Sequence, residues 1–443
     1  MKTLKQRLMG LVEAAPRVRP SGQDLRTWVF FVMIQVGVTI CVPVFLLGVQ
    51  LGRHMPYPTM VLAVFLGALV VAVLASSTGL VGTYCRLPTA LVLRKTFGVV
   101  GGRITTLVLV ISTFGWFGVQ TELLVHNVRE VVQARELFDI GRPGLTAIVG
   151  LFMCTTAVIG FRALGKVAYL AVPFLILLLC IPLWRGLAAT GVSAILDAQR
   201  EPEIYSFGFV VSVVSGSYMV GVAVMPDITR FLRSPTDTVA GAAIGLSIAY
   251  PLLLCMSAAL GAIYASGDLV EIMSRAGFVV PALFVMFLAT WTSNDKNLYE
   301  ASLSLSTLIP VIPRWAVTAL AGAAGVCLAM VGIFDHFILM LIFLGVFISP
   351  IGAVYAADFW IHRRTYIDPD AHSPAVRIAP FVAWGVGVGL GLATLPKASY
   401  GLGLFELSRA PTLDALLGAA LAMIAIRLFQ RVSGQLSGVE IIP

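Results

Sequence analysis

Long apolar stretches separated by short polar segments dominate the chain. A stretch of about 18 or more apolar residues is long enough to cross a bilayer as a helix. Backbone groups in lipid must be satisfied within the segment, which favours helices over open strands. The pattern predicts twelve transmembrane helices, near residues 27–51, 58–82, 103–131, 144–163, 166–186, 205–226, 238–265, 276–298, 314–333, 335–359, 378–395 and 410–431.

The composition agrees with this pattern. Hydrophobic residues make up 58% of the chain and charged residues only 12%, and the mean hydropathy is +0.95. This balance excludes a soluble domain and indicates an all-α polytopic membrane protein. The six cysteines and five histidines are dispersed without CxxC or Cys/His spacing. The sequence therefore predicts neither a disulfide framework nor a transition-metal site.

Charge is distributed in a way that predicts orientation. The formal net charge is +8, but the basic residues lie between the apolar stretches and form no patch for nucleic acid. With the N-terminus inside, roughly 20 basic residues fall on the inner side and roughly 9 on the outer side. We therefore expect residues 1–26 and 432–443 to be cytoplasmic tails, residues 360–377 to form a cytoplasmic loop, and the protein to lie in the inner (plasma) membrane.

Two of the predicted helices contain internal breaks. The first reads QVGVTICVPVFLLG, with Gly37 and Pro43 in mid-helix, and the sixth reads VSGSYMVGVAVMPD, with Gly216 and Gly221 in mid-helix. The breaks are five helices apart, and such a pair at corresponding positions of two halves is typical of transporters with inverted repeats. The alternative is ordinary glycine packing between membrane helices.

Residues 287–300, FLATWTSNDKNLYE, place a polar cluster at the end of an apolar helix. Polar groups in lipid require a partner. Ala289, Thr292 and Ser293 share one helix face, offering one carbonyl and two hydroxyls. Together with carbonyls of the broken first helix, they would suit a hard cation such as Na⁺. The alternative is that these polar groups satisfy one another between helices.

A second candidate site lies on the third helix, which reads ISTFGWFGVQTELL. Ser112, Trp116 and Gln120 follow one another at intervals of four and share a face. An indole and an amide suit a flat, hydrogen-bonding heterocycle, and Gly115 would permit close approach. A packed tryptophan with a glutamine bonded across helices explains the same pattern. On the sixth helix, Ser217 and Tyr218 adjoin the break, where backbone groups are free.

Four segments resemble the nucleobase–cation symporter family, most closely its bacterial cytosine permeases: GWFGV at 115–119, RKTFGVVGG at 94–102, PDITRF at 226–231 and WTSNDKNLY at 291–299. The resemblance implies a LeuT-type fold. Residues 27–359 would form a ten-helix core with inverted repeats at 27–186 and 205–359, and residues 378–431 would form two further helices.

The resemblance also implies residue roles. Trp116 and Tyr218 match aromatic residues on the two faces of the substrate ring, and Asn294 matches an amide that reads its edge; the expected substrate site also includes Gly115, Gln120, Gly216 and Ser217. The expected cation ligands are Gly37, Ile40, Ala289, Thr292 and Ser293. The chain departs from the cytosine permeases in having Thr113, Tyr218 and Lys296, and Gln120 resembles the hydantoin-transporting branch.

The prediction is a secondary transporter, not an enzyme, that imports a nucleobase or a related planar N-heterocycle by symport with Na⁺. A proton-coupled carrier is the alternative, with Glu122, Asp227 or Asp295 as proton-carrying groups. A channel and a membrane enzyme are the readings from other classes; the sequence has no nucleophile–base pair or phosphate loop. No cofactor besides the coupling ion and no obligate protein partner is expected.

Overall fold

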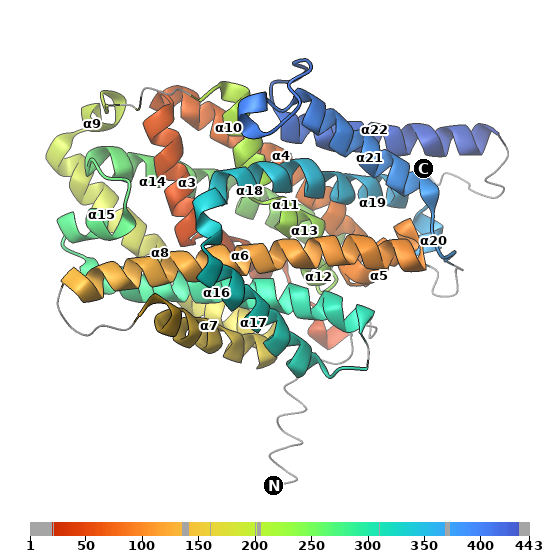
Figure 1. Cartoon of the computed structure of the whole chain (residues 1–443), viewed down its shortest axis with the longest axis horizontal. Helices are drawn as coiled ribbons and strands as arrows, with labels where there is room; N and C mark the ends of the chain where they lie inside the picture. The colour runs from red at the N-terminus through yellow and green to blue at the C-terminus, as the bar shows by residue number, and fades with distance from the viewer. Residues whose placement is uncertain are drawn as a thin grey trace, which may run out of the picture.

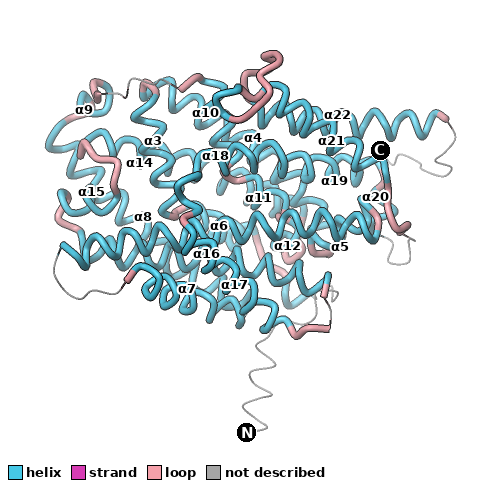
Figure 2. Tube along the Cα trace, viewed as in Figure 1, coloured by secondary structure: helices cyan, strands magenta, loops and turns pink. Residues whose placement is uncertain are grey.

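The computed structural model describes residues 20–433 apart from 21, 135–140, 160, 200, 202–204, 310 and 368–372. Across this described part every regular element is helical (Figure 2), and β pairing is confined to an isolated bridge between Arg26 and Leu232. The all-α prediction is therefore confirmed. Most of the predicted tails, 1–26 and 432–443, lies outside the described residues.

Each predicted apolar stretch coincides with one helix or with consecutive helices. In chain order they are α2 (Trp28–Thr39) with α3 (Val42–His54), α4 (Tyr57–Cys85), α6 (Val99–Ala134), α7 (Arg142–Ile159), α8 (Phe161–Thr190), α10 (Phe207–Gly216) with α11 (Met219–Ala223) and α12 (Pro226–Thr229), α13 (Pro235–Ala242) with η2 (Ala243–Ala249) and α14 (Tyr250–Ile263), α16 (Val279–Leu308), α17 (Arg314–Val331), η3 (Ile333–His336) with α18 (Phe337–Phe343), η4 (Leu344–Ile348) and α19 (Ser349–Ile361), α21 (Ile378–Thr394) and α22 (Pro411–Val432).

By length and hydropathy, six of the described helical segments could cross a membrane singly, and α2 with α3 is a seventh if the bent pair counts as one span. The count of twelve spans remains a prediction. Shorter helices connect the long ones at their ends: η1 (Gly22–Asp24), α5 (Thr89–Phe97), α9 (Ser193–Leu196), α15 (Leu269–Arg275), α20 (Arg363–Ile367) and η5 (Lys397–Ser399).

The long helices α6 and α16 lie side by side through the middle of the molecule (Figure 1), whereas α21 and α22 pack together at one edge. A Cβ on Gly387 of α21 would lie only 2.5 Å from the backbone oxygen of Ala415 of α22. Small residues thus let the two backbones approach closely, as is common between membrane helices. The same edge is joined to α19 by the buried pair of Asp358 and Arg427, whose Nε donates to Oδ1 at 2.8 Å.

The break in the first predicted helix is present as a 65° bend between α2 and α3. Ile40 follows the last residue of α2, and Cys41 is extended (φ −132°, ψ 160°) before Val42 begins α3. Pro43 in the first turn of α3 has no N–H, so the sequence does not continue the hydrogen-bond ladder across the bend. Backbone groups at the two facing helix ends are therefore available to other partners.

The second predicted break is also present. Helix α10 ends at Gly216, Ser217 and Tyr218 form a turn, and α11 begins at Met219. The second break contacts the last turns of α2, because the Tyr218 hydroxyl donates to Gln35 Oε1 at 3.3 Å. The breaks thus bring two distant parts of the chain to one place. That they mark two inverted repeats remains a prediction.

Candidate functional site

A small cavity of ≈ 40 Å³, here called the central cavity, lies where the two broken helices meet α6 and α16. Five of the predicted site residues line it: Trp116, Gln120, Ser217, Tyr218 and Ser293. The remaining lining residues are Val38, Cys41, Val44, Val220, Gly221, Lys296, Asn297 and Glu300. Residues far apart in the sequence therefore meet at one site with both aromatic and polar walls.

The aromatic walls are held in place by neighbouring rings and hydroxyls. Trp116 is 8% exposed and Tyr218 6% exposed. The Tyr218 ring packs at a tilt against Tyr250, with centroids 5.7 Å apart. The Tyr250 hydroxyl in turn lies 2.5 Å from Ser217 Oγ and donates to Val214 O at 3.1 Å. A rigid aromatic surface of this kind suits a flat ring, because its side chains lose little conformational entropy when the ring stacks on them.

Two polar atoms in the lining lack partners. Gln120 Oε1 and Asn297 Nδ2 are buried and make no hydrogen bond within the described part of the protein. Leaving a buried polar atom unpaired costs about 1–3 kcal/mol. One acceptor and one donor at the same cavity therefore indicate a bound molecule that supplies the complementary groups.

Of the α16 face that lines the cavity, only Ser293 was predicted as a site residue from the sequence. This face consists of Ser293, Lys296, Asn297 and Glu300, which follow one another with the i, i+3, i+4, i+7 spacing of one helix face. Extending the polar stripe from Ser293 along that spacing would have identified it. Lys296 and Glu300 form an ion pair in which Nζ lies 2.9 Å from Oε2.

Asn294 faces away from the cavity lining. Its Nδ2 lies 3.0 Å from Thr121 Oγ1 and 3.4 Å from the Phe117 carbonyl, both on α6. Gly115 and Gly216 are likewise not among the lining residues. A Cβ on Gly216 would lie 2.5 Å from Leu341 O, and one on Gly115 would lie 3.7 Å from Met340 Sδ. These three positions fit contacts between helices.

Three of the expected cation ligands, Gly37, Ala289 and Thr292, lie close together between α2 and α16. Thr292 Oγ1 lies 2.9 Å from the Ala289 carbonyl and 3.4 Å from the Gly37 carbonyl. Ile40 is the residue that directly follows α2, and Ser293 lines the adjacent cavity. Neutral oxygens from two helices suit a hard cation. The described residues contain no group of three or more His, Cys, Asp or Glu side chains that could hold a transition metal.

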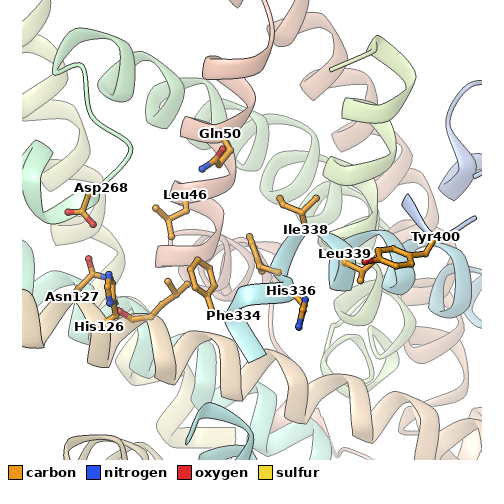
Figure 3. Close-up of a pocket in the computed structure, with 12 residues that line it drawn as sticks. Leu46, Gln50, His126, Asn127, Asp268, Phe334, His336, Ile338, Leu339 and Tyr400 are labelled. Atoms are coloured by element: carbon orange, nitrogen blue, oxygen red, sulfur yellow. Dashed lines mark hydrogen bonds between the residues drawn. The ribbon is translucent and has the colours of Figure 1, made fainter. Parts of the chain in front are cut away.

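A larger cavity of ≈ 510 Å³, here called the vestibule, lies between α3, α6, η3 and α18 (Figure 3). Asn127 Oδ1 is buried and has no hydrogen-bond partner in the described structure. The vestibule was not anticipated from the sequence. It is lined by Leu46, Gln50, Leu123, His126, Asn127, Asp268, Phe334, His336, Phe337, Ile338, Leu339 and Tyr400.

The carboxylates proposed as proton carriers do not line the central cavity. Glu122 forms an ion pair with Arg142 of α7 and accepts a hydrogen bond from the Phe334 N–H at 3.0 Å. Asp227 accepts the Thr89 N–H at 2.7 Å. Asp295 lies on α16 but is absent from the cavity lining. Glu122 therefore fits a cross-link between α6, α7 and η3.

Residues 20–377 match a family described as permeases for cytosine/purines, uracil, thiamine and allantoin. The cytosine permease of Escherichia coli (strain K12) is 28% identical over 333 residues, which are 75% of this chain and 78% of that protein. The allantoin permease of Bacillus subtilis (strain 168) is 22% identical over 392 residues, which are 79% of each chain.

Solved structures of transporters share the fold. Mhp1, a nucleobase-cation-symport-1 family transporter in a closed conformation with bromovinylhydantoin bound, has a TM-score of 0.79 at 16% identity, covering 95% of this chain and 96% of Mhp1. A Na⁺-coupled sialic acid symporter in a substrate-bound outward-open state has a TM-score of 0.66 at 11% identity, covering 97% and 96%. The predicted LeuT-type fold is thus confirmed.

Proposed function

The chain belongs to the family of permeases for cytosine, purines, uracil, thiamine and allantoin, and on that premise we propose that it imports a planar N-heterocycle, a nucleobase or a close relative, together with Na⁺. It is a nucleobase-type transporter of the nucleobase–cation symporter family and not an enzyme. The coupling ion, the direction of transport and the substrate ring are the parts that we propose.

The observation that supports this function best is the pairing of aromatic walls with unpartnered amide atoms in one small cavity. Trp116 and Tyr218 offer ring faces, while Gln120 Oε1 and Asn297 Nδ2 offer an acceptor and a donor. A heterocycle presents the matching features, namely two flat faces and an edge with both donors and acceptors. We assign the reading of the edge to Gln120 and Asn297, and we assign Asn294 to the contact between α16 and α6.

Five residues would hold the cation: Gly37, Ile40 and Ala289 through carbonyls, and Thr292 and Ser293 through hydroxyls. The proximity of Thr292 Oγ1 to the Gly37 and Ala289 carbonyls supports this assignment. A cation held between the α2 end and α16 would stabilise the conformation in which these two elements are close. If the heterocycle prefers the same conformation, each ligand raises the affinity for the other.

We propose that the protein lies in the inner membrane with both termini in the cytoplasm. Basic residues are concentrated in the segments that this orientation places on the cytoplasmic side. The vestibule, which is lined by the second half of α6 and by residues of η3 and α18, then faces outward. The central cavity lies beneath it. This arrangement suits a carrier with alternating access better than an open channel, since the central cavity is small and its aromatic and polar lining residues are buried.

Uptake into proteoliposomes tests the function. We expect labelled uracil, cytosine or a hydantoin to accumulate when an inward Na⁺ gradient is imposed, and to accumulate much less in the Trp116→Ala variant. Uptake that follows a proton gradient and ignores Na⁺ would overturn the choice of coupling ion. Failure to transport any planar N-heterocycle under either gradient would overturn the proposed function itself.

A further inference from the structure

Two opposite charges lie together in the wall of the central cavity. Lys296 and Glu300 are one turn apart on α16, and their side chains are only 4% and 1% exposed. Lys296 Nζ lies 2.8 Å from Oε1 and 2.9 Å from Oε2 of Glu300. Burying a charge is costly even when it is paired, and an apolar pair of similar volume is often equally stable. The ion pair therefore needs an explanation beyond stability.

Its position supplies one, because both side chains line the cavity together with Ser293 and Asn297 on the same helix face. The ammonium carries three N–H donors, and the carboxylate can accept about four hydrogen bonds. Their mutual contact uses only part of that capacity. A molecule in the cavity can thus bond to both groups while the ion pair stays intact.

The ion pair differs from the amides in the same cavity in one respect. Gln120 and Asn297 each carry a donor and an acceptor, so by turning over they can match either order of groups on a ring. The ammonium of Lys296 can only donate, and the ionised carboxylate of Glu300 can only accept. The pair therefore presents a fixed donor beside a fixed acceptor.

We propose that Lys296 and Glu300 select heterocycles with a cyclic amide edge, in which a ring carbonyl accepts from Lys296 and the adjacent ring N–H donates to Glu300. This inference rests on the proposed function and narrows its substrate class to rings that contain a –CO–NH– unit. Hydrogen bonds to charged groups are about twice as strong as neutral ones. A ring without the N–H would leave a buried carboxylate acceptor facing an apolar group, and sites of this type reject such analogues strongly.

Matched ligands and a matched variant test the proposal in protein reconstituted into lipid nanodiscs. Uracil has the amide edge, whereas 1,3-dimethyluracil keeps the ring and both carbonyls but has no ring N–H. We expect wild-type protein to bind uracil at least about tenfold more tightly than the dimethyl ring. In Lys296→Met/Glu300→Met, which replaces the ion pair by apolar side chains, the preference should fall to about threefold or less, through weaker uracil binding.

A second variant and two controls distinguish the proposed role of the ion pair from misfolding and from nonspecific effects of substitution. Lys296→Gln/Glu300→Gln keeps polar groups of similar size but removes the fixed polarity, and it should lose preference in the same way if the apolar variant does not fold. Glu271→Gln/Arg275→Gln removes another i, i+4 pair, which is half exposed on α15, and should keep the wild-type preference. Trp116→Ala should weaken both rings alike, which shows that both occupy the central cavity.

The outcomes separate the two proposals. Equal wild-type affinity for uracil and dimethyluracil, or an undiminished preference in both double variants, would overturn the role of the ion pair while leaving heterocycle transport standing. If wild-type protein binds none of uracil, cytosine and a hydantoin, the proposed function fails and the inference fails with it.

Discussion

The indole of Trp116 meets the ring of Phe337 edge to face, with centroids 6.1 Å apart and planes inclined by 82°. Trp116 lines the central cavity and Phe337 lines the vestibule. These two rings therefore form part of the partition between the two spaces. A molecule that moves from the vestibule to the central cavity must pass or displace this contact.

Replacing Phe337 by alanine should open the partition, because it removes the ring that contacts Trp116. Cys41 lines the central cavity and is 6% exposed, so it can report access. In a background where Cys41 is the remaining cysteine, we expect a small polar thiol reagent to label it about tenfold faster in Phe337→Ala. Phe343→Ala, at the other end of α18, is the control; equal labelling rates in both variants would contradict a partition at Phe337.

The aromatic wall and the amides should behave differently on substitution. Stacking of a base on an aromatic ring contributes about 1–3 kcal/mol, so Trp116→Ala should weaken binding of every accepted heterocycle by roughly tenfold or more. Gln120→Ala and Asn297→Ala should instead change the order of preference among cytosine, uracil, hydantoins and purines, since each ring pairs differently with the lost amide. Competition binding with this panel measures both effects.

Asn294 provides the matched control for those amides. Its Nδ2 bonds to Thr121 rather than lining the cavity, so Asn294→Ala should lower thermal stability and leave the order of preference unchanged. A reordered preference in Asn294→Ala with none in Asn297→Ala would return the edge-reading role to Asn294.

The contrast between Asn294 and Asn297 shows how far the sequence could predict this site. Hydropathy and helix periodicity were enough to predict the helices, the two breaks and the shared face of Trp116 and Gln120, since these depend on local spacing. Which face of α16 meets the cavity depends on how that helix is rotated against α6. That rotation is set by tertiary packing, so a stretch in which six consecutive residues are polar, 292–297, did not reveal it.

The vestibule illustrates a different limit. Its lining comes from α3, α6, η3, α18 and the segments around Asp268 and Tyr400. No sequence motif joins these segments, because a cavity is defined by what the packed helices leave unfilled. The i, i+4 spacing of Lys296 and Glu300 was enough to predict an ion pair from the sequence. The position of that pair in the cavity wall depends on tertiary packing and could not be predicted.

The proposed cation site predicts a loss of coupling on removal of either hydroxyl. Thr292→Ala and Ser293→Ala each delete one proposed oxygen ligand and leave Trp116 in place. We expect Na⁺ to stimulate heterocycle binding much less in both variants, while binding without Na⁺ persists. Thr290→Ala, which removes a hydroxyl on the same helix outside the proposed ligand set, is the control. Wild-type Na⁺ stimulation in both test variants would place the cation elsewhere.

Topology can be checked without a substrate. If the chain has twelve spans and a cytoplasmic N-terminus, as the distribution of basic residues predicts, reporters that are active only in the cytoplasm should work when fused to either terminus. The same reporter inserted after Tyr400, in the segment between α21 and α22, should be silent. Activity after Tyr400 together with a silent C-terminal fusion would require an odd number of spans.

The last prediction concerns the attachment of α22 to the rest of the protein. Asp358 on α19 is fully buried and accepts hydrogen bonds from Arg427 Nε at 2.8 Å and from the Tyr366 hydroxyl at 2.6 Å. Removing one partner of a buried ion pair leaves an uncompensated charge and costs about 3–5 kcal/mol. Arg427→Met should therefore lower thermal stability strongly. Asp358→Asn/Arg427→Met should recover much of the loss, because neither charge remains.

The exposed pair of Glu406 and Arg409 supplies the comparison, and its double glutamine variant should change stability little, as surface ion pairs contribute little. Thermal unfolding in nanodiscs measures all three variants. A double variant no more stable than Arg427→Met would show that the packing of the arginine side chain, rather than charge compensation, attaches α22.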